Sequence, residues 1–287
     1  MIDLIQLKRD IIKDLKNLKK NANIHSLHLI GSHTDENKSL DRLNDFDILV
    51  LTNEKLNGNN YSSISKNLNE ICNKYNSNEV QMIVETTHAN IKLKPKKDTN
   101  IQLHQITFFY EDFIKGFNSG NLALHNWVLM GKTIFGKPLR DLVDVKPISK
   151  EQLSHERDSI DFFIRIINDK KNIGSAHVIK GDELIKKTIQ IPVTEEDELE
   201  LFFIALNETL GNLLKFTHHK NIIYSFKERI IFLKQNLNNQ EYVDVLINLK
   251  QIKDRLRNCE KIGYDLNYFK QATLRILKAL KNKFKLK

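Results

Sequence analysis

The spacing of apolar residues changes character near residue 147. Before it, short apolar runs of strand length alternate with amphipathic stretches, and after it apolar residues recur at helical spacing. The first part predicts helices at about 2–20, 61–75 and 111–130, and strands at about 25–30, 46–52, 80–84 and 101–109. The second part predicts helices at about 150–168, from Thr194 through Leu214, and at about 221–237, 240–258 and 264–284. Residues 174–190 stay undecided.

This pattern predicts an α+β chain with two domains. Residues 1–147 are expected to form a mixed sheet flanked by helices, and residues 148–287 an α-helical bundle. A linker is predicted at Pro147-Ile148-Ser149, because strand-like patterns stop there. Thr194, with Asp197 three residues later, predicts the capped start of one bundle helix.

Two carboxylates open the second predicted strand. Asp45 and Asp47 are separated by one residue, so in a β-strand their side chains point to the same face. Adjacent like charges repel, and a divalent cation such as Mg²⁺, which takes carboxylate oxygens, would hold them together. After the first strand, Gly31-Ser32 opens a turn or helix whose backbone N–H groups and hydroxyl suit a phosphate. The pattern predicts a site for a metal-bound nucleoside triphosphate.

This constellation resembles the nucleotidyltransferase superfamily related to DNA polymerase beta, including its minimal and antibiotic-modifying members. The shared pattern is an apolar residue, Gly-Ser, an interval, and then Asp-apolar-Asp-apolar. Here it reads Ile30-Gly31-Ser32, twelve residues, and Asp45-Phe46-Asp47-Ile48. Residues 131–139 are similar to a segment that often closes such domains, and the resemblance covers about residues 20–145.

The resemblance implies transfer of a nucleoside monophosphate from a nucleoside triphosphate, ATP by default, to a hydroxyl of an acceptor, with two Mg²⁺ ions. Asp45 and Asp47 would bind the metals, and Gly31 and Ser32 would hold the β- and γ-phosphates. The acceptor stays open among a small molecule, a protein and an RNA. Further candidates for phosphate contact lie in the polar interval: Lys38 and Arg42.

Members of the superfamily usually add a third carboxylate from a neighbouring strand. The strand expected to supply it, 101–109, has Gln102 and His104 in place of an acid. His104 is a candidate base or metal ligand, and Glu85, at the end of the preceding strand, is a candidate acid. The alternative hypothesis is a catalytically inactive nucleotidyltransferase-like module that binds RNA or a protein partner.

The composition limits the expected classes of binding partner and the expected cellular compartment. A formal net charge of +9 and a pI near 9.3 favour anionic partners, including nucleic acid on a basic surface. Cys72 and Cys259 lie far apart, which excludes a disulfide framework and a cysteine-based zinc site and suits a reducing cytoplasm. We expect Cys72, on a helical apolar stripe, to be a core residue. Without a signal-peptide core or a run of eighteen apolar residues, the sequence predicts a cytoplasmic protein with no membrane partner.

Overall fold

The computed structural model forms two compact units that exchange segments of the chain. It describes residues 3–21, 23–35, 37, 38, 40, 46–88, 101–147, 149–257, 260 and 262–286. The first unit comprises residues 1–118, 123–144 and 174–189, and the second comprises 119–122, 145–173 and 190–287. The boundary predicted after residue 147 lies close to the change at 144/145, while the segment 174–189 is grouped with the first unit.

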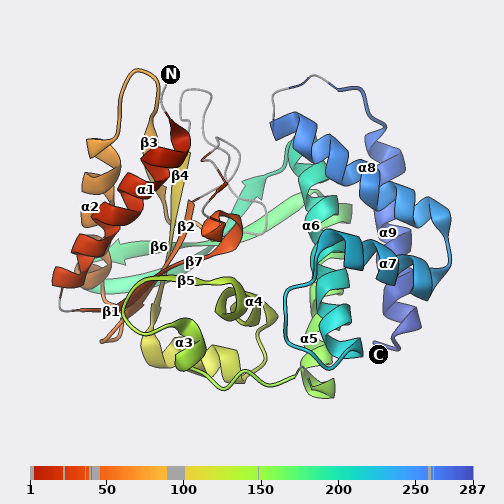
Figure 1. Ribbon diagram of the computed structural model, residues 1–287, viewed down its shortest axis with the longest axis horizontal. Helices are drawn as coiled ribbons and strands as arrows, with labels where there is room; N and C mark the ends of the chain where they lie inside the picture. Colours follow the sequence, from red (N-terminus) through yellow and green to blue (C-terminus); the bar gives the residue numbers. More distant parts are fainter. Residues whose placement is uncertain are drawn as a thin grey trace. The chain divides into compact units, whose positions relative to one another are not determined.

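A five-stranded mixed sheet is the centre of the first unit (Figure 1). Strand β2 pairs in parallel with β4 and antiparallel with β1, which in turn pairs antiparallel with β5. Strand β3 pairs in parallel with the outer edge of β4, so the order is β3-β4-β2-β1-β5. The strands are β1 (Ile24–Leu29), β2 (Phe46–Thr52), β3 (Met82–Glu85), β4 (Ile101–Phe109) and β5 (Lys132–Phe135).

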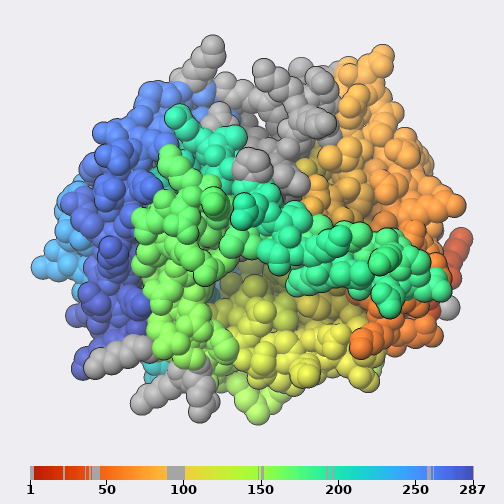
Figure 2. All heavy atoms as spheres, turned by 180° about the vertical axis from the view of Figure 1, so that it is seen from behind, coloured from red at the N-terminus to blue at the C-terminus, as the bar shows by residue number. Residues whose placement is uncertain are grey.

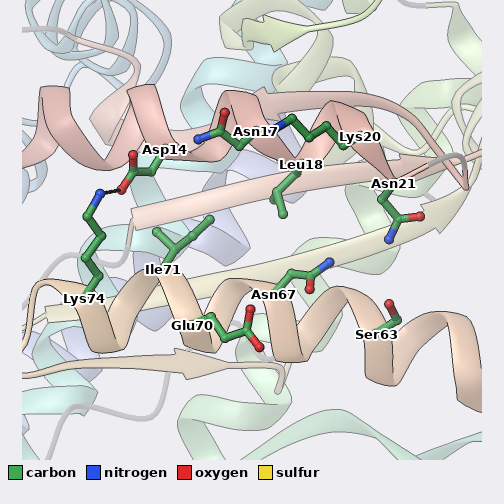
Figure 3. Close-up of a pocket in the computed structure, with 10 residues that line it drawn as sticks. All are labelled: Asp14, Asn17, Leu18, Lys20, Asn21, Ser63, Asn67, Glu70, Ile71 and Lys74. Atoms are coloured by element: carbon green, nitrogen blue, oxygen red, sulfur yellow. Dashed lines mark hydrogen bonds and ion pairs between the residues drawn. The ribbon is translucent and has the colours of Figure 1, made fainter.

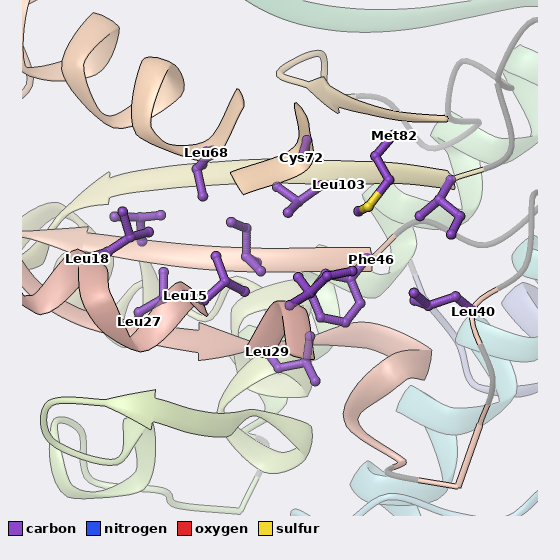
Figure 4. Packing of buried hydrophobic residues seen from close by; sticks show 14 of the residues in the cluster. Leu15, Leu18, Leu27, Leu29, Leu40, Phe46, Leu68, Cys72, Met82 and Leu103 are labelled. Carbon is purple, nitrogen blue, oxygen red and sulfur yellow. The ribbon is translucent and has the colours of Figure 1, made fainter. Parts of the chain in front are cut away.

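Helices α1 (Leu4–Leu15) and α2 (Gly58–Lys74), with the 3-10 helix η1 (Lys16–Lys20), cover one face of this sheet (Figure 1). Alternate strand residues reach this layer, because successive side chains of a strand point to opposite faces. From β2 these are Phe46, Ile48 and Val50, all fully buried. Figure 4 shows Phe46 among the residues of this core. Cys72 of α2 lies in the same core, as predicted, and burial raises the pKa of its thiol to about 12.

The other face of the sheet carries α3 (Tyr110–Asn118) and α4 (Leu122–Met130), which contact the strands partly through aromatic rings. Phe108 of β4 lies 6.1 Å from the ring of Phe113 and 6.2 Å from that of Trp127. The sequence predicts one helix over 111–130, but the chain breaks it at Gly120, whose φ of +87° ends the helical path.

The segment left undecided by the sequence is a β-hairpin, β6 (Lys171–Lys180) and β7 (Glu183–Pro192). Its turn packs on the start of α2, where Gly58 N donates to Asp182 O at 2.8 Å. Farther along, Ser175 and His88 exchange two backbone hydrogen bonds of 2.7 and 2.8 Å. In Figure 2 the hairpin crosses the surface as a sea-green band that ends on the orange segment containing α2. A distant segment of sequence therefore completes the first unit.

The second unit contains a helical bundle around α6, as the sequence predicts. Helix α6 contacts the other four, and its buried side includes Phe202, Leu206 and Leu210. Thr194 and Asp197 form the predicted capping box at its start. The helices are α5 (Lys150–Asp169), α6 (Glu195–Thr217), α7 (Phe226–Leu237), α8 (Gln240–Arg257) and α9 (Leu266–Lys283). In the part of the chain that the structure describes, no helix has both the length and the apolar character needed to cross a membrane.

Candidate active site

Asp47 occupies the face of β2 opposite to α1 and α2. Its neighbours Phe46 and Ile48 point into the core beneath those helices, so the strand alternation fixes Asp47 on the other side. The residue is 8% exposed, which leaves its carboxylate close to the surface of an otherwise buried strand. The structure thus places one of the two predicted acids on the sheet face that α1 and α2 do not cover.

The Gly31 turn lies directly against this carboxylate. Ile30 N donates to Asp47 O at 3.0 Å, and the 3-10 helix η2 (Gly31–Thr34) begins at the next residue. Gly31 has a φ of +71°, and a Cβ atom added to it would lie 2.5 Å from Asp47 Oδ2. Only glycine satisfies both conditions without strain. The two parts of the sequence motif are therefore in contact, with the Ser32 side chain exposed beside them.

We expect Gly31→Ala to lower the free energy of unfolding by about 1–3 kcal/mol, because alanine disfavours the left-handed backbone and its methyl displaces the Asp47 carboxylate. Gly181→Ala is the matched control, since Gly181 has a φ of +62° and a Cβ atom added to it would meet no described atom within 4 Å. Urea unfolding of both variants measures the difference. Equal losses would show that the contact with Asp47 contributes nothing.

His104 of β4 is the direct neighbour of Asp47 across the parallel pair. His104 Nδ1 lies 2.8 Å from Asp47 Oδ1, and His104 Nε2 lies 2.9 Å from the carbonyl oxygen of Thr87. The carbonyl oxygen of Thr87 can only accept, so Nε2 carries a hydrogen. His104 therefore links Asp47 to the backbone of Thr87, with a bonding partner at each of its ring nitrogens.

Glu85 lies on the same face, one strand farther out. It is the register partner of His104 in the β3–β4 pair, so Glu85, His104 and Asp47 form a row across three strands. Neighbouring strands are about 4.8 Å apart, which puts the backbones of Glu85 and Asp47 roughly 10 Å from each other. The half-buried Glu85 carboxylate accepts from Thr87 N at 2.6 Å. The sequence predicts each of these residues as a separate candidate, but their position in one row follows only from the strand order and register.

The other predicted site residues are less closely tied to this row. Lys38 N donates to Asp35 O at 3.3 Å, and the Lys38 carbonyl oxygen accepts from Lys8 Nζ at 3.0 Å. Asp45 and Arg42 lie outside the described residues, so their roles stay predictions. Among the residues that are described, no group of three or more His, Cys, Asp or Glu side chains could hold a metal ion by itself.

Sequence reasoning missed a series of rings that leads from His104 to the hairpin. His88 lies 5.2 Å from His104 and 5.8 Å from His177 of β6, measured between ring centroids. Tyr61 of α2 follows, 4.9 Å from His177. Burial lowers the pKa of His177, with Lys186 acting in the same direction, and burial raises the pKa of Tyr61 to about 12. The hairpin thus supplies a side chain close to the candidate site, a contribution that no local motif indicates.

Comparison with solved structures finds the crystal structure of spectinomycin adenyltransferase AAD(9) from Enterococcus faecialis with ATP and spectinomycin. The TM-score is 0.53 at 14% sequence identity, and the match covers 95% of this chain and 99% of that one. This chain therefore has a nucleotidyltransferase-like fold, which confirms the predicted fold class and the family likeness of the fold. No protein-family model matches the sequence, and a search of curated proteins finds no match.

Proposed function

We propose that this chain transfers a nucleoside monophosphate from a nucleoside triphosphate, with ATP as the first donor to test, to a hydroxyl of a small molecule. The observation that carries the proposal is the contact between the Gly31 turn and the Asp47 carboxylate, which brings the two parts of the motif together. The AAD(9) structure contains ATP and spectinomycin, which favours a small-molecule acceptor over a protein or an RNA.

Mg²⁺ fits the donor chemistry of this site. Asp47 offers carboxylate oxygens, and Asp45 would offer a second carboxylate two residues earlier. Because Mg²⁺ is commonly bound by one or two carboxylates together with substrate phosphates, a third protein ligand is not required. When bound, the metal would neutralise charge that builds on the phosphate oxygens during transfer. Ser32, with Lys38 and Arg42, is proposed to contact the phosphates.

In the proposed reaction, the acceptor oxygen attacks the α-phosphorus and forms the new phosphate ester. The bond from the α-phosphorus to the oxygen that bridges to the β-phosphorus breaks, and pyrophosphate leaves. The proton of the acceptor hydroxyl passes to a base, for which Glu85 is our candidate. We assign His104 a positioning role, because both of its ring nitrogens are already bonded, one of them to Asp47.

Incubation of the purified chain with Mg²⁺, ATP labelled at the α-phosphate and a panel of hydroxylated small molecules, spectinomycin included, tests this function. We expect label to move to an acceptor with release of one pyrophosphate per transfer, and EDTA to stop both. In parallel reactions, other nucleotides replace ATP as the donor, and protein extract or RNA replaces the small molecules as the acceptor. A folded chain that labels none of these acceptors with any nucleotide would contradict the proposal.

The contact between His104 and Asp47 favours a second candidate, a module that binds RNA or a protein without transfer. Asp47 Oδ1 already has His104 Nδ1 as a partner at 2.8 Å, so this oxygen is less available to a metal than one without a partner. Titration of Mg²⁺·ATP and of a single-stranded RNA over a series of salt concentrations separates the two functions. Salt-sensitive RNA binding without nucleotide binding would support the second candidate, since contacts to a phosphate backbone weaken steeply with salt.

A further inference from the structure

Two cavities of the first unit lie beside α1, and their charges differ. The larger, of about 640 Å³, is a groove between α1, η1 and α2 (Figure 3). It contains both signs of charge, and Lys74 Nζ pairs there with Asp14 Oδ2 at 2.5 Å. The hydrogen bond from Lys74 lowers the pKa of Asp14. Because this groove neutralises its own charges, it gives no reason to expect a charged ligand.

The smaller cavity, of about 340 Å³, lies between α1 and the edge strand β5 and is strongly cationic. Lys8, Arg9 and Lys16 approach it from the helix side and Lys132 from the strand. Among the described residues that line it, none has a carboxylate side chain. Its remaining lining is largely aliphatic: Ile12, Leu29, Thr133 and Ile134. The positive charges of this lining repel one another more strongly than they would in open water, because the effective dielectric constant is lower beside apolar surface.

Lys8 is the buried member of this set, with 1% of its surface exposed. Its Nζ donates to the carbonyl oxygen of Asp35 and, at 3.0 Å, to that of Lys38. Burial lowers the pKa of Lys8, the charge of Asp35 opposes this, and the charge of Lys132 adds to the lowering. A buried lysine held near other cations is costly, so an anion in the cavity would stabilise the arrangement.

We propose that this cavity is a binding site for a small anion with at least two linked phosphate groups, either inorganic diphosphate or a nucleotide. Its volume is at the low end of the range of about 300–1,000 Å³ that is typical of small-molecule sites, which favours such an anion over a nucleic-acid strand. The phosphates would contact Arg9, Lys16 and Lys132 at the mouth. A nucleoside, where present, would rest on Ile12 and Ile134.

This site is separate from the candidate active site. Leu29 and Ile12 belong to the layer of α1 and α2, whereas Asp47 is on the opposite face of the sheet. Lys8 connects the two sites, because it contacts the loop that follows the Gly31 turn. The anion site therefore does not depend on the proposed transfer reaction, although a bound anion would share the Lys8 ammonium with that loop.

Binding of diphosphate and of ATP, each measured in EDTA by isothermal titration, tests the proposal. We expect saturable binding that weakens about tenfold or more in Arg9→Ala/Lys16→Ala/Lys132→Ala, because three exposed charges are lost together. The matched control Lys13→Ala/Lys19→Ala removes charge from the exposed side of the same segment and is expected to bind as the unaltered chain does. Equal affinity for diphosphate and ATP would show that the cavity recognises the linked phosphates alone. Tighter binding of ATP would show that it recognises a nucleotide.

Lysine acetylation read by mass spectrometry gives a second measurement on the unaltered chain. Diphosphate is expected to reduce labelling of Lys16 and Lys132 several-fold while labelling of Lys13 stays unchanged. The absence of saturable binding, equal binding by the triple variant, or binding of a single-stranded RNA in place of both small anions would overturn the proposal.

Discussion

Asp47→Asn is expected to lower the rate of pyrophosphate release by about a thousandfold or more, because the site loses the negative charge that would bind the metal and offset the phosphate charge. The asparagine amide oxygen can still accept the hydrogen bond from His104 Nδ1, so the local structure should survive. The measurement is the steady-state release of pyrophosphate at saturating Mg²⁺ and ATP, once an acceptor is known.

Asp158→Asn is the control for this change, because it makes the same replacement at an exposed position of α5. We expect it to keep full activity. The control should unfold in urea within about 1 kcal/mol of the unaltered chain, as is usual for surface changes. Asp47→Asn also alters a buried contact with His104, so its activity is measured under conditions in which urea unfolding shows that the variant is folded. Full turnover by folded Asp47→Asn would exclude Asp47 from the chemistry and, with it, the proposed reaction.

The second large effect concerns Glu156, which is buried in the helical bundle. Asn212 Nδ2 donates to Glu156 Oε2 at 2.7 Å, while Oε1 has no hydrogen-bond partner among the described residues. Burial raises the pKa of Glu156 to about 8, from an ordinary value of 4.5, although its bond with Asn212 opposes the rise. The folded chain therefore holds the proton more tightly than the unfolded chain does.

This proton makes stability depend on pH. Between about pH 5 and pH 8 the folded state binds the extra proton, so the free energy of unfolding falls as pH rises, by up to about 1.4 kcal/mol per pH unit from this group. Glu156→Gln keeps an oxygen to accept from Asn212 and cannot ionise. We expect the variant to gain a few kcal/mol over the unaltered chain at pH 8 relative to pH 5.

Urea unfolding of both proteins at pH 5 and pH 8 measures this difference. Contributions from other groups, such as His28, whose pKa burial lowers to about 4, are common to both proteins and cancel. Lys215, whose pKa burial lowers to about 8, changes stability mainly above this range. Parallel pH dependence in the two proteins would show that Glu156 is ionised in the folded chain.

The parts of the site that local rules determine were predictable from the sequence. Strand alternation is enough to place Asp47 opposite Phe46, and a Gly-Ser pair after an apolar strand indicates the turn that meets it. The neighbours of Asp47 were not predictable in this way. His104 lies beside it only because β4 inserts in parallel between β2 and β3, a pairing that depends on long-range contacts.

The remaining differences have similar physical origins. The hairpin strands β6 and β7 mix polar and aliphatic residues without a regular period, and this pattern does not separate strand from helix strongly. Local preference leaves the secondary structure of this segment undecided. Its backbone hydrogen bonds to Gly58 and His88, which are distant in sequence, favour the hairpin. The helix predicted over 111–130 is apolar on both sides of Gly120, so its periodicity does not reveal the break that the glycine makes.

The position of the hairpin has a consequence for how the protein can be divided. A polypeptide ending at residue 147 contains every strand of the five-stranded sheet but lacks Ser175, His177 and Asp182. It would expose the backbone amides of Gly58 and His88, together with one face of Tyr61, to solvent. We therefore expect a first unit that retains residues 174–189 to be more stable than one cut at residue 147, so truncation studies should graft this segment.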